Sequence, residues 1–401
     1  MSSVKIMDNL FWCGVFDPNM RIFDIAIPTE KGTTYNSYLI VGKNKKALID
    51  ASKLDFKKEY LDHIEEICSI KEIDYIIVNH TEPDHSGTLP FIVDINPDIE
   101  VIYSKTAKGF VDNVLNRPYK GRAVGDNDAI DLGGLTLQFF HAPFLHWPDT
   151  MFTYLKEYKV LFPCDFLGSH YCDTNLFNDK VVNKEEAFDA FKYYYMCIMR
   201  PFNDYISNAF KKIAQLDIQM ICPSHGPILR ENLDAYMNFY KEQAKRHNLR
   251  RENNQAVIVY ASAYGNTKKL AEKIHEGISD SGVKVKIFDA SDCNMEDLIN
   301  EIEASNGLLI GTATINSKTP KPIFDVFSSM VVLNVAGRIA GVFGSYGWSG
   351  EGITICEDIV RTMRMKTPLE SFKVKMTPSE KELNDASEWG REFGIALLGS
   401  S

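Results

Sequence analysis

The sequence lacks the features that mark membrane, secreted and nucleic-acid-binding proteins. No stretch approaches the ~18 consecutive apolar residues of a membrane span. The formal net charge of −10 argues against nucleic acid or an anionic membrane as the partner, and leaves room for a small redox or metabolite partner. The N-terminal segment has no basic region followed by a long apolar run, so we expect no signal peptide and a cytoplasmic protein.

Cysteine pairs, repeats and low-complexity tracts are also missing. The 8 cysteines form no C-x-x-C pair, and the chain is too long to need a disulfide framework. We therefore expect reduced, buried thiols. No segment repeats along the chain, and no tract is of low complexity.

What is present is the composition of a soluble globular protein with two domains. Hydrophobic residues make up 45% and charged residues 24% of the sequence, as in soluble globular proteins. A length of 401 residues is too great for one ordinary domain, so we expect two. The polar segment 241–255 precedes a strongly apolar run. We place the boundary near residue 252, which gives domains of residues 1–252 and 253–401.

The two domains differ in their predicted strand patterns. In the first, short β-branched and aromatic runs come early and helical segments follow, which suggests a sheet sandwich covered by helices. The predicted strands are 21–27, 36–42, 46–51, 74–79, 100–104, 135–142, 150–155 and 159–165. In the second, strands at 256–262, 283–290, 306–313 and 338–345 alternate with amphipathic segments. That alternation is typical of a doubly wound parallel sheet.

A loop rich in metal-ligand residues follows one buried strand. The apolar run "IDYIIV" leads into "NHTEPDHSG", which holds His80, Glu82, Asp84 and His85. Three further segments each place one such residue at a strand end, in a loop containing glycine or proline: His146 in "FLHWPDT", Asp165 in "LFPCDFLG" and His225 in "ICPSHGPI". We expect one rim of the sandwich to carry all seven side chains.

The number and type of these residues indicate the metal. Four histidines and three carboxylates are too many for one tetrahedral zinc, and suit two metals that share a bridge. Imidazole with carboxylate and open positions is the ligand mix of non-haem iron. Because Glu82 is anionic where a histidine would be neutral, it favours the higher oxidation state of iron. We therefore expect redox chemistry rather than hydrolysis.

An anion-binding loop opens the second domain. The stretch "VIVYASAYGNTKKLAEKI" reads as strand, tight loop and helix, so hydroxyls and backbone N–H groups meet at a helix N-terminus. It is neither a Walker loop nor G-x-G-x-x-G, which makes a dinucleotide an unnatural ligand. Two more loops, "GTATINSK" and "GSYGWSGEG", follow later strands. Three loops at successive strand ends predict one cofactor pocket.

On these motifs the chain resembles the flavodiiron proteins, or A-type flavoproteins. The first domain resembles the metallo-β-lactamase fold, an αββα sandwich whose hydrolytic members carry H-x-H-x-D-H where this chain has H-x-E-x-D-H. The resemblance implies one iron held by His80, Glu82 and His146, a second held by Asp84, His85 and His225, and Asp165 as the bridge. It also matches Tyr195 to a tyrosine that lines the diiron pocket, although a core tyrosine is as good a reading, and His170 could be a hydrogen-bond donor behind a ligand.

The second domain resembles flavodoxin, a doubly wound α/β fold with a parallel sheet that binds FMN. The resemblance implies that FMN contacts the phosphate loop and the two later loops, with Tyr264 and Trp348 beside the flavin ring. The residues implied are Ser262, Ala263, Tyr264, Gly265, Asn266, Thr267, Thr312, Thr314, Ile315, Asn316, Ser345, Tyr346, Gly347 and Trp348.

The family resemblance further implies reduction of dioxygen to water, of nitric oxide to nitrous oxide, or both. It implies a head-to-tail homodimer, or a dimer of dimers, that brings each flavin beside its partner's irons. No pair of C-x-x-C-G loops follows the flavodoxin part, so we expect a separate electron donor. A rubredoxin is the first choice and a deazaflavin coenzyme the second. Two alternatives stay open: a zinc hydrolase fused to a flavodoxin module, and an electron carrier with a vestigial metal site.

Overall fold

The computed structural model describes residues 2–25, 27–251 and 254–399, with only the backbone given for 246–251. The chain divides into two compact units, Met1–Ala244 and Lys245–Ser401. The boundary predicted at residue 252 lies outside the described residues. Helix α7 (Leu233–Arg251) continues through most of the polar segment that we took as the seam between domains.

Two sheets form the centre of the first unit. Within the described residues, the seven-stranded sheet has the order β1-β2-β7-β8-β9-β10-β11 and the five-stranded sheet the order β12-β13-β14-β15-β16. The strands are β1 (Val4–Met7), β2 (Leu10–Trp12), β7 (Tyr38–Val41), β8 (Lys46–Ile49), β9 (Tyr75–Val78), β10 (Glu100–Ser104), β11 (Gly121–Val124), β12 (Ala129–Asp131), β13 (Thr136–His141), β14 (Met151–Leu155), β15 (Val160–Phe162) and β16 (Met220–Ile221). Short pairs β3 (Val15–Asp17) with β6 (Thr33–Tyr35), and β4 (Ile22–Phe23) with β5 (Ile27–Pro28), lie beside them.

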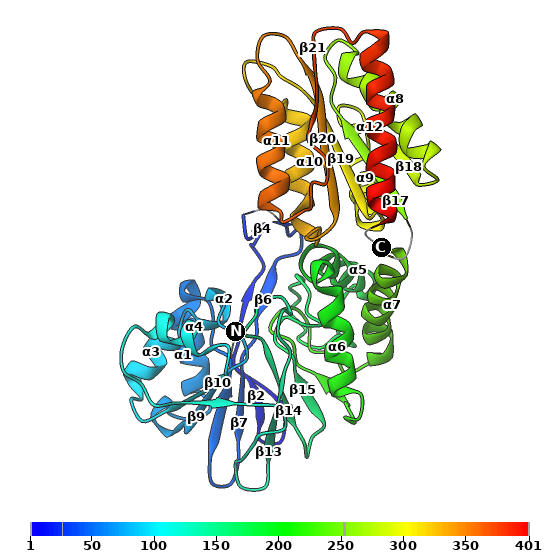
Figure 1. Cartoon of the computed structure of the whole chain (residues 1–401). Helices are drawn as coiled ribbons and strands as arrows, with labels where there is room; N and C mark the ends of the chain where they lie inside the picture. The colour runs from blue at the N-terminus through cyan, green and yellow to red at the C-terminus, as the bar shows by residue number, and fades with distance from the viewer. Residues whose placement is uncertain (1, 26, 252–253, 400–401) are drawn as a thin grey trace. The chain divides into compact units, whose positions relative to one another are not determined.

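Helices cover both outer faces, so the unit has four layers (Figure 1). A core cluster containing Ile77 and Phe139 fills the space between the sheets. A second packs the first sheet against α1 (Lys57–Glu65), α3 (Leu89–Ile95) and α4 (Lys108–Leu115), and a third packs the second sheet against α5 (Lys184–Tyr194), α6 (Asn203–Ile213) and α7. Three apolar interfaces between four layers confirm the predicted αββα sandwich.

The second unit is one parallel sheet of order β18-β17-β19-β20-β21 with helices on both faces. Its strands are β17 (Gln255–Tyr260), β18 (Lys284–Asp289), β19 (Gly307–Ala313), β20 (Ile339–Tyr346) and β21 (Phe372–Lys375). Helices α8 (Asn266–Asp280) and α12 (Glu380–Leu398) cover one face, and α9 (Met295–Ala304), α10 (Lys321–Ser329) and α11 (Glu351–Thr362) cover the other. The predicted doubly wound fold is confirmed.

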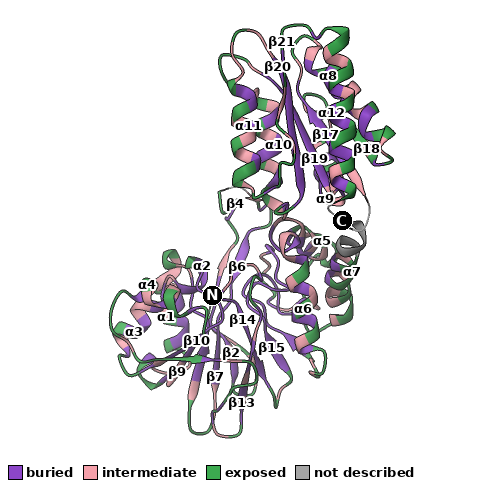
Figure 2. Ribbon diagram, in the orientation of Figure 1, coloured by how far each residue is buried: buried purple, intermediate pink, exposed green. Residues whose placement is uncertain are grey.

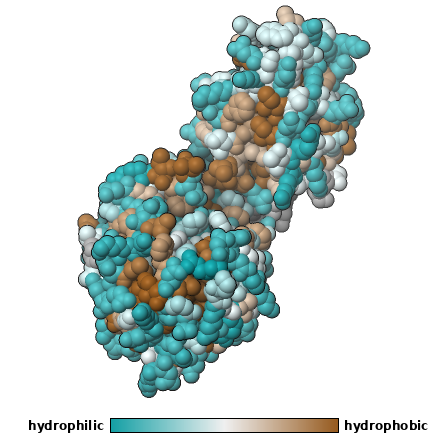
Figure 3. Space-filling model, turned by 90° about the vertical axis from the view of Figure 1, so that its left-hand side faces the viewer, coloured by the Kyte–Doolittle hydropathy of each residue, from teal (hydrophilic) through white to brown (hydrophobic). Residues whose placement is uncertain are grey.

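Burial follows these layers in both units. Figure 2 shows buried residues along the strands and on the inner faces of the helices, with exposed residues at helix surfaces and loop tips. The face in Figure 3 is mostly hydrophilic and carries a few hydrophobic patches on each unit. Among the described residues, no helix combines the length and apolarity needed to cross a membrane.

Some predicted elements differ from the structure. Residues 21–27 do not form one strand, because Asp24 and Ile25 have φ of 46° and 52° and turn the chain between β4 and β5. The N-terminal strands β1 and β2 and the fifth parallel strand β21 were not predicted. The edge strand β1 has no buried residue and the edge strand β21 has one, so the apolar pattern of both strands is weak.

Candidate metal centre and cofactor pocket

The metal-ligand residues gather at the ends of strands in the first unit. His80 follows β9, Asp165 follows β15 and His225 follows β16, while His146 lies in the loop from β13 to β14. The single turn of α2 (Pro83–Ser86) carries the two residues Asp84 and His85. Because β9 and β10, like β15 and β16, run parallel, their carboxyl ends bring these loops to one rim.

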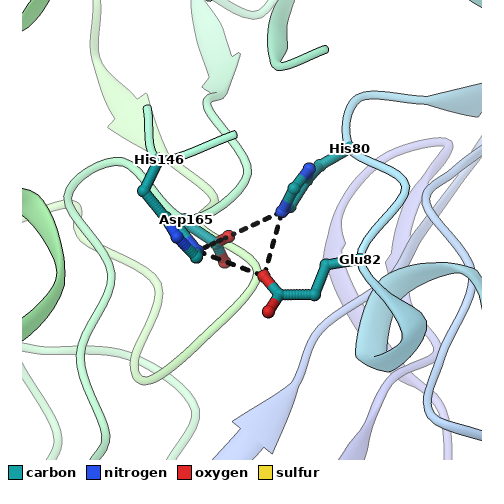
Figure 4. A group of neighbouring side chains, drawn as sticks. All are labelled: His80, Glu82, His146 and Asp165. Atoms are coloured by element: carbon teal, nitrogen blue, oxygen red, sulfur yellow. Dashed lines mark hydrogen bonds and ion pairs between the residues drawn. The ribbon is translucent and has the colours of Figure 1, made fainter. Parts of the chain in front are cut away.

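One group of four side chains surrounds a single point (Figure 4). The Oε2 atom of Glu82 lies 3.1 Å from Nε2 of His80 and 3.1 Å from Nε2 of His146. The Oδ2 atom of Asp165 lies 3.5 Å and 3.4 Å from the same two nitrogens. These four residues offer two imidazole nitrogens and two carboxylate oxygens to one cation.

A second group meets the first at Asp165. The oxygens of Asp84 lie 3.3 Å from Nε2 of His85 and 3.1 Å from Nε2 of His225. The Oδ1 atom of Asp165, the oxygen not used by the first group, lies 3.0 Å from His85 and 3.4 Å from His225. The two oxygens of one carboxylate therefore face two different donor groups, which is the arrangement of a bridge between two metals.

The polar atoms of this cluster fit cations that they would ligate. In the described part of the chain, both oxygens of Asp84 and of Asp165 are buried without a hydrogen-bond partner, as is Nε2 of His85, His146 and His225. Buried polar atoms without partners cost free energy, and native proteins rarely leave them so. Nitrogens and oxygens that lie close together without hydrogen-bond geometry are directed at shared points, and metal ions would satisfy them.

The charges of the cluster point the same way. Burial would lower the pKa of His80, but hydrogen bonds to Asp149 and Glu82 raise that pKa to about 10. Burial would raise the pKa of Asp84, but the positive charges of His85 and His225 beside its oxygens hold that pKa at about 2. Protonated histidines thus balance the negative charge of the carboxylates in the metal-free centre. Metal cations would balance that charge instead, because metal binding releases the histidine protons.

Two outer contacts orient the histidines. His80 Nδ1 lies 3.2 Å from Oδ1 of Asp149, and His225 Nδ1 lies 2.7 Å from the backbone oxygen of Thr34. A partner on Nδ1 fixes the ring so that Nε2 faces the centre. Asp149 was not predicted, although it lies three residues after His146, because an aspartate in a loop carries no distinctive signal.

The structure changes the predicted pocket tyrosine. The Tyr195 hydroxyl donates to Asn203, and its ring packs on Phe239 and Tyr240. The ring centroid of Tyr194 instead lies 4.8 Å from that of His170 and 6.2 Å from that of His225. Tyr194, whose buried hydroxyl has no partner among the described residues, therefore lies beside the two histidines, and Tyr195 packs in the core.

His170 lies where the prediction put it, next to the metal-ligand residues. Its Nδ1 lies 3.0 Å from Oγ1 of Thr33, and its ring centroid lies 5.1 Å from that of His225. Burial lowers the pKa of His170 well below its ordinary value, so the ring is neutral. Its buried Nε2 has no partner in the described part of the chain, which leaves a free polar atom beside the centre.

A cavity of about 400 Å³ touches both donor groups. Its lining includes Phe23 and Asp24 of the β4–β5 hairpin, Glu82 of the first group and Asp84 of the second. Small molecules can therefore reach one carboxylate of each group from the same side.

The predicted loops of the second unit form a separate pocket of about 350 Å³. Of the predicted residues, those that line it are Ser262, Ala263, Tyr264, Asn266, Thr314, Ile315, Ser345, Tyr346, Gly347 and Trp348. Met376, which follows β21, lines it too and was missed because that strand was not predicted.

The four remaining predicted residues lie around this pocket rather than on its wall. Gly265 caps α8 at φ 82°, a left-handed conformation that favours glycine, and nothing would meet a Cβ there. Thr267 Oγ1 lies 2.9 Å from Oγ of Ser345, and Thr312 Oγ1 donates to the oxygen of Ala313. Asn316 follows Ile315 with φ 50°.

The chemistry of this pocket fits a flavin mononucleotide. In the described part of the chain, the hydroxyl oxygens of Ser262 and Thr314 are buried without partners, and the pocket lies at the N-terminus of α8, where a phosphate is favoured. Tyr264 is 93% and Trp348 76% exposed at its rim. Two such exposed aromatic side chains beside neutral donors suit a flat ring system.

Comparisons with known proteins agree with both sites. Residues 33–226 match the family described as ODP family beta lactamase, and residues 258–390 match Flavodoxin. The chain is 38% identical to the Flavo-diiron protein FprA2 of Clostridium acetobutylicum, over 99% of this chain and 100% of that one. It is 32% identical to the nitric oxide reductase of Moorella thermoacetica, over 98% of each.

Among solved structures, the rubredoxin oxygen:oxidoreductase of Desulfovibrio gigas is similar over 100% of this chain and 99% of its own, with a TM-score of 0.71 and 26% identity. The similarity covers both units and both candidate sites. The flavodoxin match and the flavo-diiron relative imply FMN and a diiron centre. The two donor sets described above suit the two irons. The chain therefore belongs to the flavodiiron proteins, a family of oxidoreductases.

Proposed function

We propose that this protein reduces dioxygen to water, nitric oxide to nitrous oxide, or both, with electrons that pass through FMN from a rubredoxin-type donor. The observation that carries the proposal is the position of Asp165, whose two oxygens face two separate groups of donors. Such a bridge would hold two metals side by side at the cavity that Glu82 and Asp84 line.

We assign the iron ligands to the two donor groups. His80, Glu82 and His146 form one set, Asp84, His85 and His225 the other, and Asp165 belongs to both. Each set then has two neutral nitrogens and one anionic oxygen of its own. The short distances between donors within each set, 3.0 to 3.5 Å, support this division.

The iron pair and the flavin together supply one electron from each iron and two from FMN, enough to reduce dioxygen to water in one pass. The chain's own residues shape where this happens. The ring centroid of Phe23 lies 4.6 Å from that of His170. This apolar ring therefore limits the access of water to His170. The free hydroxyl of Tyr194 and the free Nε2 of His170 are buried polar atoms that can hydrogen-bond a polar product.

The names of similar proteins support the reaction class without choosing one gas. One relative is named for nitric oxide reduction and one structural neighbour for rubredoxin and oxygen. We propose rubredoxin as the donor and a deazaflavin coenzyme as the alternative. The exposed rim residues Tyr264, Trp348 and Met376, and Ile22 at the cavity mouth, support a head-to-tail homodimer in which these surfaces are covered.

The test is anaerobic reduction followed by parallel exposure to each gas. Protein loaded with iron and FMN is supplied with rubredoxin, its reductase and NADH, and the consumption of dioxygen and of nitric oxide is followed with electrodes. We expect turnover of at least one gas, which stops when rubredoxin is omitted. Zinc content with hydrolase activity would instead establish the alternative enzyme, and flavin cycling without gas consumption would establish an electron carrier.

A further inference from the structure

The two iron sites assigned above have matching inner donors. Each has two histidines, one carboxylate of its own and one oxygen of Asp165. The charge of the donors therefore gives neither site a higher affinity for ferric iron. Any difference between the two sites has to come from the groups behind the ligands.

Behind His80 lies a buried carboxylate. Oδ1 of Asp149 is 3.2 Å from Nδ1 of His80, and the Asp149 side chain is 0% exposed. Its other oxygen accepts from the backbone nitrogen of Thr81 at 2.8 Å and from the hydroxyl of the same residue at 2.6 Å. A full negative charge is thus fixed on the far side of the imidazole, in surroundings that screen it little.

Behind the other histidine pair the partners are neutral. His225 Nδ1 lies 2.7 Å from the backbone oxygen of Thr34, and His85 Nδ1 has no hydrogen-bond partner in the described part of the chain. The buried Asp50 lies near both sets, but its oxygens accept from the backbone and side-chain nitrogens of Asn79 rather than from a ring. Among the rings of His80, His85 and His225, in the described part of the chain, only that of His80 has a carboxylate within hydrogen-bond distance of Nδ1.

We propose that Asp149 makes the iron held by His80, Glu82 and His146 the harder of the two to reduce. A carboxylate on Nδ1 makes the imidazole a stronger donor and so stabilises the ferric ion. With iron bound to both sets, the site of Asp84, His85 and His225 would therefore accept an electron more readily than the site of His80. Asp149 is a positioning residue, because it acts through His80.

The decisive variant is Asp149→Asn, which keeps an oxygen to accept from His80 but removes the charge. The measurement is a redox titration of iron-loaded protein, with the mixed-valence signal followed by electron paramagnetic resonance. The height of that signal gives the comproportionation constant, which reports the gap between the two reductions. We expect the constant to fall at least tenfold, which narrows the gap by about 59 mV for a one-electron couple. Asp126→Asn, which removes a surface carboxylate paired with Lys212, should leave the constant unchanged.

A reverse variant keeps the proposal testable if Asp149→Asn does not load iron. Thr81→Val removes the hydroxyl that donates to Asp149 and leaves the carboxylate a stronger acceptor for His80. The constant should then rise, by less than the first variant lowers it. Absence of any coupled iron pair in the parent protein would overturn the proposed function on which this inference depends. A coupled pair whose constant does not respond to either variant would overturn the role of Asp149 alone.

Discussion

The metal centre and the flavin pocket are built in opposite ways. At the metal centre the polar atoms are charged and buried, as shown by Asp165, which is 1% exposed, and His80, which is 0% exposed. At the flavin pocket the side chains are neutral, and Trp348 and Tyr264 remain 76% and 93% exposed. The metal centre is buried in the first unit, whereas the flavin pocket lies at loops that follow the strands of the parallel sheet.

This difference determines what each cofactor does for its unit. Folding of the first unit brings together charges that only protons or metals can balance, so its stability depends on what occupies the centre. The second unit satisfies its backbone through a complete parallel sheet, so FMN adds binding energy to a fold already formed.

Replacing the bridge should abolish the iron chemistry and spare the flavin. In Asp165→Ala we expect the iron content to fall and gas consumption to drop by at least about 100-fold. Mutating a residue that only hydrogen-bonds a metal ligand lowers activity by about 10- to 100-fold, and loss of a ligand should cost at least as much. The FMN content should match that of the parent protein. Metal analysis, flavin absorbance and electrode assays check this. Retention of two irons together with turnover would show that Asp165 is not the bridge.

The metal-free protein should lose stability as the pH rises. The pKa of His85 is about 9 in the folded protein, since the charges of Asp84 and Asp165 outweigh the effect of burial. A histidine whose folded pKa exceeds its unfolded value of about 6.5 stabilises fully below that value, and the contribution is lost as the pH rises towards 9.

Urea unfolding of apoprotein at pH 6 and pH 9 measures this effect. We expect the free energy of unfolding of the first unit to be lower at pH 9 by more than about 1.4 kcal/mol, the value of one pKa unit. Iron-loaded protein serves as the control and should show a smaller change, because metal already occupies the histidine nitrogens. Equal stability of the apoprotein at both pH values would contradict the charge balance described for the centre.

Removing an aromatic side chain at the flavin rim should weaken FMN binding and leave iron loading intact. For Trp348→Ala we expect about tenfold weaker binding, which corresponds to ~1.4 kcal/mol and to the size of aromatic contacts. Flavin fluorescence titration measures it. Val331→Ala, at another exposed apolar position of this unit, should bind FMN like the parent. A loss of iron in the tryptophan variant would mean that the two sites are not independent in this way.

The smallest expected effect distinguishes two neighbouring tyrosines. Tyr194→Phe removes a hydroxyl beside His170 and His225, so we expect gas turnover to fall a few-fold with iron content unchanged. Tyr195→Phe removes a hydroxyl that donates to Asn203, so we expect lower thermal stability with little change in turnover per iron. The reverse pattern would return the pocket role to Tyr195.

Much of this arrangement could be predicted from sequence, because a residue that directly adjoins a strand is held at the edge of the sheet where that strand ends. Each of the seven metal-ligand residues follows or precedes a recognisable strand, and the structure brings them together. Their assignment to particular irons stays a prediction. The phosphate loop was predictable for the same reason, since it joins β17 to α8 directly.

The failures arise where spacing stops being regular. After α5 the chain forms a π-helical turn, Tyr195–Met199, so helical periodicity does not tell which of two adjacent tyrosines faces the histidines. Asp149 and Met376 were missed because each depends on a loop whose path is fixed by contacts distant in sequence, such as Asp149 with His80, 69 residues apart. Such contacts leave no local pattern.

A Mössbauer spectrum with metal analysis on purified, iron-reconstituted protein shows whether seven side chains hold two irons bridged by Asp165. We expect two irons and one FMN per chain, with the irons magnetically coupled as one pair. A single uncoupled iron, or zinc in place of iron after reconstitution, would contradict this assignment.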